Sequence, residues 1–249
     1  MEKSSNPSFF IRQASIEDAP SLLSIYRPYV ENTAITFEED PPSLEDFQHR
    51  MTSTLERYPY LAALSDGRIA GYAYAGPFQP RKAYDHAAEL SIYIAPPFHH
   101  RGLGKSLYGQ LESILLSQQV FNLYACIAVT RREDPFLPKD SPLFHRSLGF
   151  KTLGCFEKCG YKFGRWYDMI WMGKEIGKRP LHPGAFIPFS RLFLQAVNFP
   201  AAPVKNSKRV CEEMISIFSQ TLFYSSLFST PVPSKAGMNI LSELAFCWT

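Results

Sequence analysis

The chain has 249 residues, of which 45% are hydrophobic and 20% charged, and its formal net charge is +3. This length suits one domain, with or without an extension. So small a charge without basic runs argues against nucleic-acid binding, and no apolar run reaches the roughly 20 residues that a membrane span needs. The five cysteines follow no disulfide or zinc spacing, which favours a reducing cytoplasm and no metal site.

The first third of the chain predicts one strand, two helices and a hairpin. Residues 8–14 are typical of a short strand, and residues 15–32 and 43–58 of two helices. Each helix opens on Ser-x-x-Asp, the pattern of a capping box. A hairpin is expected over residues 60–78, with Asp66-Gly67 as the two-residue turn between its alternating strands.

The rest of the chain completes a mixed α/β pattern. A β-rich run ends at two prolines, and a glycine-rich loop then opens a helix. A strand, a short helix and a last pair of strands follow, over residues 121–130, 141–150, 150–157 and 167–175. The order β-α-α-β-β-β-α-β-α-β-β predicts a mixed sheet rather than a repeat array. Strand signals are lost near residue 190. We therefore expect a domain over residues 9–190 and a C-terminal extension over 191–249, partly helical or disordered and of unknown role.

The glycine-rich loop "HHRGLGKSL" is typical of an anion site. A helix N-terminus offers unpaired N–H groups and the positive end of the helix dipole, and glycines let a ligand approach the backbone. A Walker A loop would need glycine where His99 stands, and a Rossmann fingerprint would need it at Leu107. Two adjacent histidines rarely point at one ion, which disfavours a metal. A turn that only caps the helix stays open as an alternative.

Together with its neighbours, this loop resembles a known family. The run "YAYAGPFQPRKAYDHAAELSIYIAPPFHHRGLGKSLY", followed by "FHRSLGF" and "YKFGRWYDMIWM", is similar to the phosphinothricin N-acetyltransferase branch of the GNAT superfamily. The resemblance covers roughly residues 9 to 190. It implies the GNAT fold: a mixed central sheet of about seven strands, splayed between the fourth and fifth strands and flanked by helices. It also implies acetyl-CoA as co-substrate and a small amino-acid-like amine as acceptor, acetylated by direct attack in a ternary complex.

The resemblance implies two catalytic residues. Glu89 opens the strand "ELSIYI" at the base position, and an amine must lose its proton before it attacks a thioester. His145 lies in "FHRSLGF", where many GNAT enzymes have a tyrosine that protonates the departing thiolate. Which of the two is the base stays open. Glu89 could instead be an ordinary strand-end carboxylate, and His145 a histidine buried in a helix face. An acyl-cysteine route through Cys126 is disfavoured, because a mid-strand thiol is usually buried and structural.

The cofactor-binding candidates lie on this strand, on the loop and on the helix of His145. The resemblance assigns strand backbone groups to the pantetheine arm, with one N–H polarising the thioester carbonyl, and the loop to the pyrophosphate. The family usually has Gln or Arg at position 99. The connection 131–140 is longer than expected, and Pro138 stands where an Asn would hold the arm. The candidates are Ile92, Tyr93, Ile94, His99, His100, Arg101, Gly102, Leu103, Gly104, Lys105, Ser106 and Ser141.

The acceptor candidates are Phe37, Arg81 and Tyr84, because a small anionic amino acid suits a fork donor and aromatic walls. Gln79 and His86 depart from the branch's usual Lys and aromatic residue, so the acceptor itself stays open.

Two other functions also stay open: the same fold acting on a protein N-terminus, lysine or polyamine, and a non-catalytic acyl-CoA-binding module. Basic residues at the acceptor rim favour a small anionic acceptor, and Glu89 with His145 argue for catalysis. We expect a cytoplasmic enzyme without nucleic-acid or membrane partners. The family's habit favours a homodimer, which the residues themselves do not show.

Overall fold

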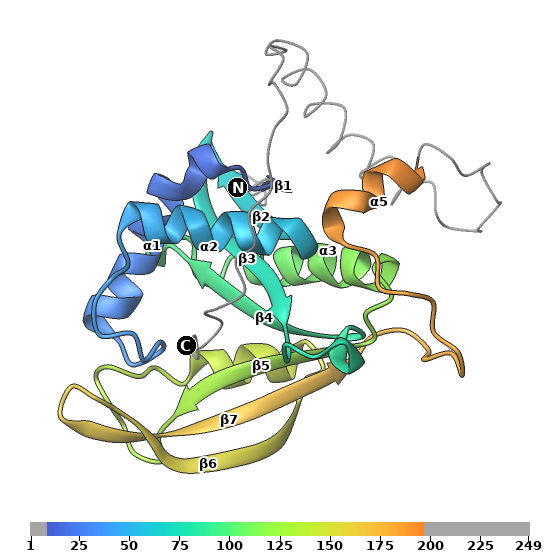
Figure 1. Cartoon of the computed structure of the whole chain (residues 1–249). Helices are drawn as coiled ribbons and strands as arrows, with labels where there is room; N and C mark the ends of the chain where they lie inside the picture. The colour runs from blue at the N-terminus through green and yellow to red at the C-terminus, as the bar shows by residue number, and fades with distance from the viewer. Residues whose placement is uncertain (1–8, 197–249) are drawn as a thin grey trace, which may run out of the picture. The chain divides into compact units, whose positions relative to one another are not determined.

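Seven strands form one sheet in the computed structural model, which describes residues 9–196 (Figure 1). The strand order is β1-β2-β3-β4-β5-β7-β6, and every neighbouring pair is antiparallel except β4 and β5. This mixed sheet confirms the predicted fold class. The strands are β1 (Phe10–Gln13), β2 (Tyr60–Ser65), β3 (Arg68–Pro77), β4 (Ala87–Ile94), β5 (Asn122–Val129), β6 (Lys151–Lys162) and β7 (Arg165–Glu175).

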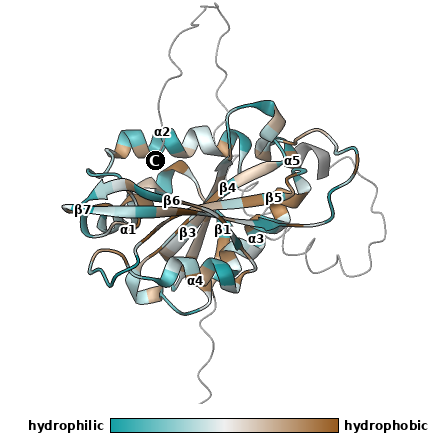
Figure 2. Ribbon diagram, turned by 90° about the horizontal axis from the view of Figure 1, so that it is seen from below, coloured by the Kyte–Doolittle hydropathy of each residue, from teal (hydrophilic) through white to brown (hydrophobic). Residues whose placement is uncertain are grey.

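Helices cover both faces of the sheet, as Figure 2 shows with α2 on one side and α3 and α4 on the other. The helices are α1 (Ala19–Asn32), α2 (Leu44–Arg57), α3 (Leu103–Ser117), α4 (Asp140–Ser147) and α5 (Phe189–Ala196), with single turns η1 (Ile16–Asp18), η2 (Lys82–Tyr84) and η3 (Pro96–Phe98). Both predicted caps are present: Ser15 and Asp18 form a capping box, and Ser43 Oγ accepts the Asp46 N–H. Within residues 9–196, no helix is long and apolar enough to cross a membrane.

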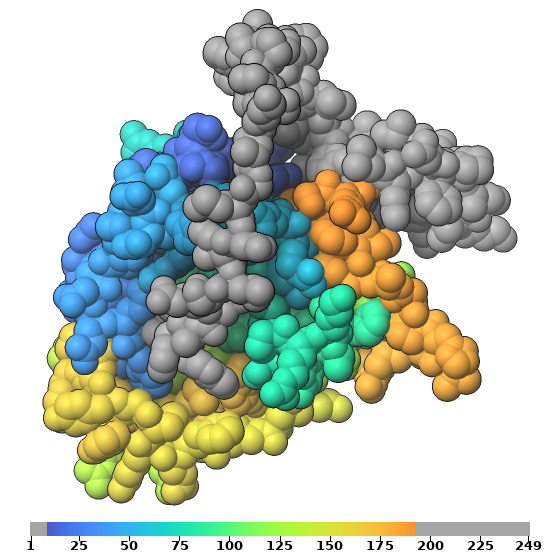
Figure 3. All heavy atoms as spheres, viewed as in Figure 1, coloured from blue at the N-terminus to red at the C-terminus, as the bar shows by residue number. Residues whose placement is uncertain are grey.

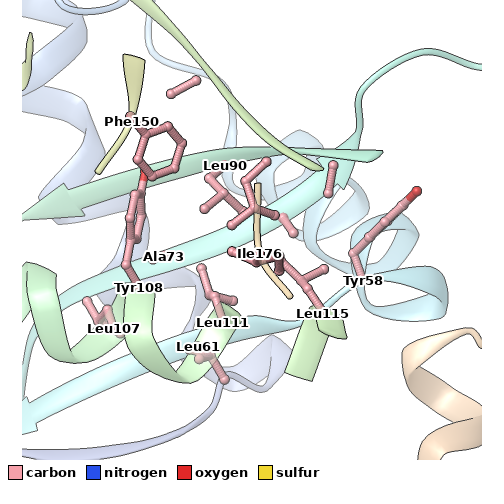
Figure 4. Packing of buried hydrophobic residues seen from close by; sticks show 14 of the residues in the cluster. Tyr58, Leu61, Ala73, Leu90, Leu107, Tyr108, Leu111, Leu115, Phe150 and Ile176 are labelled. Atoms are coloured by element: carbon pink, nitrogen blue, oxygen red, sulfur yellow. The ribbon is translucent and has the colours of Figure 1, made fainter. Parts of the chain in front are cut away.

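The strands bury two large apolar clusters, one on each face, and a smaller third cluster lies around Tyr167 of β7. Leu107, Leu111 and Leu115 of α3 are fully buried against Leu61 of β2 and Leu90 of β4 (Figure 4). On the opposite face, tyrosines of β2 and β3 pack with the apolar sides of α1 and α2. The sheet is therefore held rigidly on both sides, and its strand ends have fixed positions.

The sheet divides between β4 and β5, which diverge from their shared end in Figure 1. Their parallel pairing covers only Ala87 to Glu89 on β4 and Asn122 to Tyr124 on β5. Beyond that point β4 keeps its pairing with β3, and β5 keeps its pairing with β7. The edges that residues 90–94 and 125–129 turn toward each other are consequently open. We call this opening the fork.

The last two strands are longer than the sequence predicts. β6 was expected to end near residue 157 but continues through a register shift between Phe156 and Gly160 to Lys162, where Phe163-Gly164 turns the chain into β7. The α5 helix lies across the predicted boundary at residue 190, with Phe189 almost fully buried. The remainder of the predicted extension, residues 197–249, lies outside the described residues.

Candidate active site

A cavity lies inside the fork. Its walls come from both parted strands, from α3 and α4, and from the two segments 33–38 and 131–139. The lining residues are Ile35, Glu89, Leu90, Ser91, Ile92, Tyr93, Tyr108, Ala125, Cys126, Ile127, Ala128, Leu137, Ser141 and His145. Both predicted catalytic residues therefore face one cavity, together with the predicted cofactor-binding residues Ile92, Tyr93 and Ser141.

Glu89 stands where the two strands part. Its backbone is the last β4 position that pairs with β5, opposite Tyr124, and it also pairs with Gly76 of β3. Burial raises the pKa of Glu89 from 4.5 to about 7. Within the described chain the carboxylate has neither a hydrogen-bond nor an ion-pair partner that would favour its charged form. A carboxyl group with a pKa near neutrality is suited to accept and release protons.

His145 is almost fully buried in α4, and its two ring nitrogens have different partners. Nδ1 lies 2.8 Å from the Ser141 carbonyl oxygen, which can only accept, so Nδ1 carries the hydrogen. Burial lowers the pKa of His145 and favours the neutral ring. The Nε2 atom of that tautomer is an acceptor, and it lies 3.0 Å from the Tyr108 hydroxyl. Tyr108 therefore donates to His145.

Tyr108 is a site residue that sequence reasoning missed. It lies in the second turn of α3, almost fully buried beside Phe150 (Figure 4), and its spacing from Leu107 and Leu111 is typical of a core position. The signal that sets it apart is only visible in three dimensions, where its hydroxyl connects His145 with the cavity.

Cys126 also lines the cavity, and the expectation of a buried thiol is wrong. The residue is exposed at the cavity, and its Sγ lies 2.7 Å from Met169 Sδ. Desolvation raises the pKa of Cys126 to about 12, with the Glu89 charge as a smaller cause. A thiol that stays protonated is a poor nucleophile, so the acyl-cysteine route is not favoured.

The glycine loop leaves its backbone open to solvent at the start of α3. Gly102 has φ of +82°, and a Cβ there would meet no atom within 4 Å. The first helical N–H groups follow directly, and His100, Arg101, Lys105 and Ser106 are exposed around them. These groups fit an anion.

Gly104 and Leu103 have a different place in the loop. A Cβ on Gly104 would lie 2.9 Å from the Phe144 ring and 3.3 Å from Ile92, so this glycine lets α3 pack closely against α4 and β4. The Leu103 side chain is core, which leaves only its backbone to face a ligand.

His99 points back toward β4. Its Nε2 lies 2.8 Å from the Ile94 carbonyl oxygen and 3.1 Å from the Tyr29 hydroxyl, which itself donates to the same carbonyl at 2.6 Å. The side chain thus ties the loop to the end of β4 and to α1. The Ile94 carbonyl is occupied by these contacts.

The predicted acceptor residues do not line the cavity. Arg81 is exposed, and the Tyr84 ring, 39% exposed, contacts Phe78, which stacks on Tyr124 at the base of the fork. Phe37 packs on Gly160 of β6. In that part of the chain the cavity wall is instead formed by Ile35. In residues 9–196, no group of three or more His, Cys, Asp or Glu side chains is arranged to hold a metal ion.

Comparisons with known proteins agree with this geometry. The family model "Acetyltransferase (GNAT) domain" matches residues 11–171. A phosphinothricin N-acetyltransferase of Streptomyces viridochromogenes is 32% identical over 178 residues, which are 70% of this chain and 93% of that protein.

Two solved structures are also similar. A GNAT superfamily phosphinothricin acetyltransferase from Sinorhizobium meliloti, in complex with AcCoA, has a TM-score of 0.66 and 32% identity, over 73% of this chain and 97% of that one. A ribosomal-protein-alanine N-acetyltransferase from Brucella melitensis has a TM-score of 0.60 and 35% identity, over 67% of this chain and 99% of that one.

Proposed function

The chain belongs to the GNAT acetyltransferase family, in its phosphinothricin N-acetyltransferase-like branch, and is an N-acetyltransferase; we propose that it transfers acetyl from acetyl-CoA to the primary amine of a small amino acid or amino-acid analogue. The observation that carries the proposal is that Glu89, Tyr108 and His145 share one cavity inside the fork. The reaction takes place in a ternary complex by direct attack of the amine.

Glu89 is the general base. When bound, acetyl-CoA supplies a thioester carbonyl that an unprotonated amine can attack. An acceptor amine arrives as an ammonium ion at neutral pH, and the Glu89 carboxylate removes its proton, directly or through one water. A pKa of about 7 supports this role, because the carboxylate is substantially ionised at neutral pH and still basic enough to take the proton.

Tyr108 and His145 protonate the departing thiolate. The phenol faces the cavity, and the neutral imidazole lies behind it as a hydrogen-bond acceptor. In the proposed step the Tyr108 hydroxyl turns its hydrogen from His145 Nε2 to the thiolate sulfur, and the phenolate regains a proton from water as CoA leaves; between turnovers His145 holds the hydroxyl in place. His145 serves the reaction through Tyr108 rather than as a second base.

The free edge of β4 and the glycine loop bind acetyl-CoA. The fork-side backbone groups of Ile92 pair with the amide-bearing arm, and an N–H on this edge of β4 polarises the thioester carbonyl, whereas the backbone of Tyr93 points to β3. The N–H groups that open α3 bind the pyrophosphate, with Arg101 and Lys105 beside them. Ser141 closes the same cavity from α4.

Arg81 and Tyr84 bind the acidic group of the acceptor outside the cavity, near the base of the fork. The Arg81 guanidinium is exposed and, among the described residues, has no ion-pair partner, so it is free to pair with a carboxylate or phosphinate. Tyr84 is joined to the base of the fork through Phe78 and Tyr124.

A panel of amines tests the proposal. Purified protein is mixed with acetyl-CoA, and release of the CoA thiol is followed with a thiol reagent for phosphinothricin, methionine sulfone, methionine sulfoximine and ordinary amino acids. The proposal expects turnover with at least one of them and loss of turnover in Glu89→Gln.

The alternative acceptor is a protein N-terminus, favoured by the similarity to the Brucella melitensis ribosomal-protein-alanine N-acetyltransferase. Peptides with an N-terminal alanine and a polyamine belong in the same panel. Turnover with these amines alone would replace the small-acceptor proposal, and no turnover with any amine, while acetyl-CoA binds, would leave a non-catalytic binding module.

A further inference from the structure

Two irregular segments contribute residues to the wall of the cavity. Residues 33–38 follow α1 and contribute Ile35, and residues 131–139 follow β5 and contribute Leu137. Both segments lie against the far end of the β6–β7 hairpin, where Figure 3 shows the blue chain after α1 in contact with the yellow hairpin. Neither segment belongs to a helix or strand, so its position depends on the contacts that hold it.

Lys162, the last residue of β6, holds the first segment through its backbone. The side chain is 4% exposed, and Nζ donates to the Val30 carbonyl at 2.7 Å and to the Thr36 carbonyl at 2.9 Å. Val30 lies in the last turn of α1, where carbonyl groups lack helical partners and the helix dipole favours a cation. The ammonium therefore bridges the end of α1 and the chain that returns past the cavity.

Gly160 holds the same segment by shape. A Cβ at this position would lie 2.4 Å from the Phe37 ring, so the ring fills the space that any side chain would occupy. Lys162 binds the Thr36 carbonyl and Gly160 receives the ring of the next residue, Phe37, so two successive residues of the segment are held. Ile35, which precedes Thr36 in the chain, is presented to the cavity from this anchored stretch.

The second segment is held by the same hairpin end. Arg165 donates to the Asp134 carboxylate at 2.6 Å, and Phe136 stacks on Phe163 with ring centroids 4.4 Å apart. The Ala34 N–H donates to the Phe136 carbonyl at 2.8 Å, which joins the two segments to each other. The longer connection after β5 thus forms one wall with residues 33–38.

We propose that Lys162 is a positioning residue for the acceptor amine, because it fixes the segment 33–38, from which Ile35 lines the cavity and Phe37 packs on β6. The proposal rests on the proposed function of the cavity. Lys162 touches neither the fork edge of β4 nor the glycine loop, so it sets the affinity for the acceptor and leaves the affinity for acetyl-CoA unchanged.

Lys162→Met tests this inference, since methionine keeps most of the side-chain volume and removes the ammonium. With the acceptor that the panel identifies, we expect its KM to rise at least tenfold, with kcat within threefold and the acetyl-CoA Kd within twofold of the original. Lys151→Met, at the exposed start of the same strand, is the matched control and should leave the acceptor KM, kcat and the acetyl-CoA Kd unchanged. The acceptor KM of Lys162→Met combined with Phe37→Ala should be no higher than that of Phe37→Ala alone, because both substitutions act on the same segment.

Hydrogen exchange of the ligand-free protein gives a second readout. The amides of residues 33–38 should exchange at least tenfold faster in Lys162→Met, and those of α3 at the original rate. An unchanged acceptor KM with unchanged exchange overturns the inference, as does an equal loss of acceptor and acetyl-CoA affinity. If Lys162→Met does not fold, Gly160→Ala must raise the acceptor KM through Phe37 or the inference fails. If the original protein acetylates no amine, the proposed function is wrong, and the exchange rates still decide whether Lys162 positions the wall.

Discussion

Replacing Glu89 with glutamine should have opposite effects on turnover and on stability. Glutamine keeps the shape of the side chain but can neither ionise nor accept the proton. Because burial alone raises the pKa of this carboxyl from 4.5 to about 7, the folded protein prefers the neutral form by about 2.5 pKa units, or ~3 kcal/mol. The difference in unfolding free energy between the Glu89→Gln variant and the original protein should approach this value at high pH.

The sign follows from proton linkage. Between pH 4.5 and about 7 the folded protein holds a proton on Glu89 that the unfolded chain has lost, so the stability of the original protein falls as the pH rises through this window. Glu89→Gln has no such loss. In urea unfolding, the two proteins should be about equally stable near pH 4, and the variant should be more stable by up to ~3 kcal/mol at pH 8.

Turnover should change in the other direction. At pH 8, Glu89→Gln should lower kcat/KM by about 10² to 10⁴, the usual contribution of a general base. The acceptor amine titrates equally in both proteins, so the ratio of their kcat/KM values isolates the carboxylate. The kcat/KM of the original protein divided by that of the variant should fall as the pH decreases below about 7, because Glu89 becomes protonated. Glu56→Gln, at an exposed site on α2, should leave both turnover and stability unchanged. A variant that keeps full turnover, or whose stability advantage over the original protein is no larger at pH 8 than at pH 4, would refute the argument.

Three further predictions concern the proton donor, the glycine loop and the C-terminal extension. Tyr108→Phe and His145→Ala should each lower kcat at least tenfold, as measured with the thiol-release assay, and the double variant should be no slower than either, since the pair acts as one unit. Gly102→Ala should destabilise the protein by about 1 kcal/mol, because its φ is positive, and should weaken acetyl-CoA binding measured by calorimetry. Gly109→Ala lies inside the α3 helix and faces open space, so it should stabilise the protein by about 1 kcal/mol. A chain ending after residue 196 should keep turnover within about twofold, and a larger loss would place essential groups in the extension.

The fold could be predicted because local patterns and the family resemblance agree. Ser43 opens α2 as its cap, and Asp66-Gly67, both with positive φ, turn the hairpin as the dipeptide predicts. The long β6 could not be predicted, because its residues are mostly exposed and interrupted by a register shift, so no alternation marks them. The homodimer, the cytoplasmic location and the division of the chain near residue 190 stay predictions.

The site could be predicted only where its residues have a recognisable sequence context. Glu89 and His145 lie in motifs, and the structure brings them to one cavity. Tyr108 and Lys162 also lie in runs that resemble the family, but their residue types suggested no role, since a tyrosine on an apolar helix face and a lysine on a strand usually indicate core and solvent. Their roles depend on partners 37 to 132 residues away in the chain. The cofactor role expected of His99 stays a prediction, and the structure shows its side chain bound to the Ile94 carbonyl at the end of β4.

The parting of β4 and β5 leaves the sheet one strand short in its interior. An unpaired strand edge at the border of a protein invites any neighbouring sheet to join it, with aggregation as the hazard. Here β4 is paired with β3 on its other edge, and β5 is paired with β7. Because α3 and α4 contribute to the walls of the cavity between the two open edges, another folded sheet cannot enter. A narrow extended chain with its own amide groups can. The two open edges therefore offer hydrogen-bonding groups to a narrow extended molecule and are shielded from a second folded sheet.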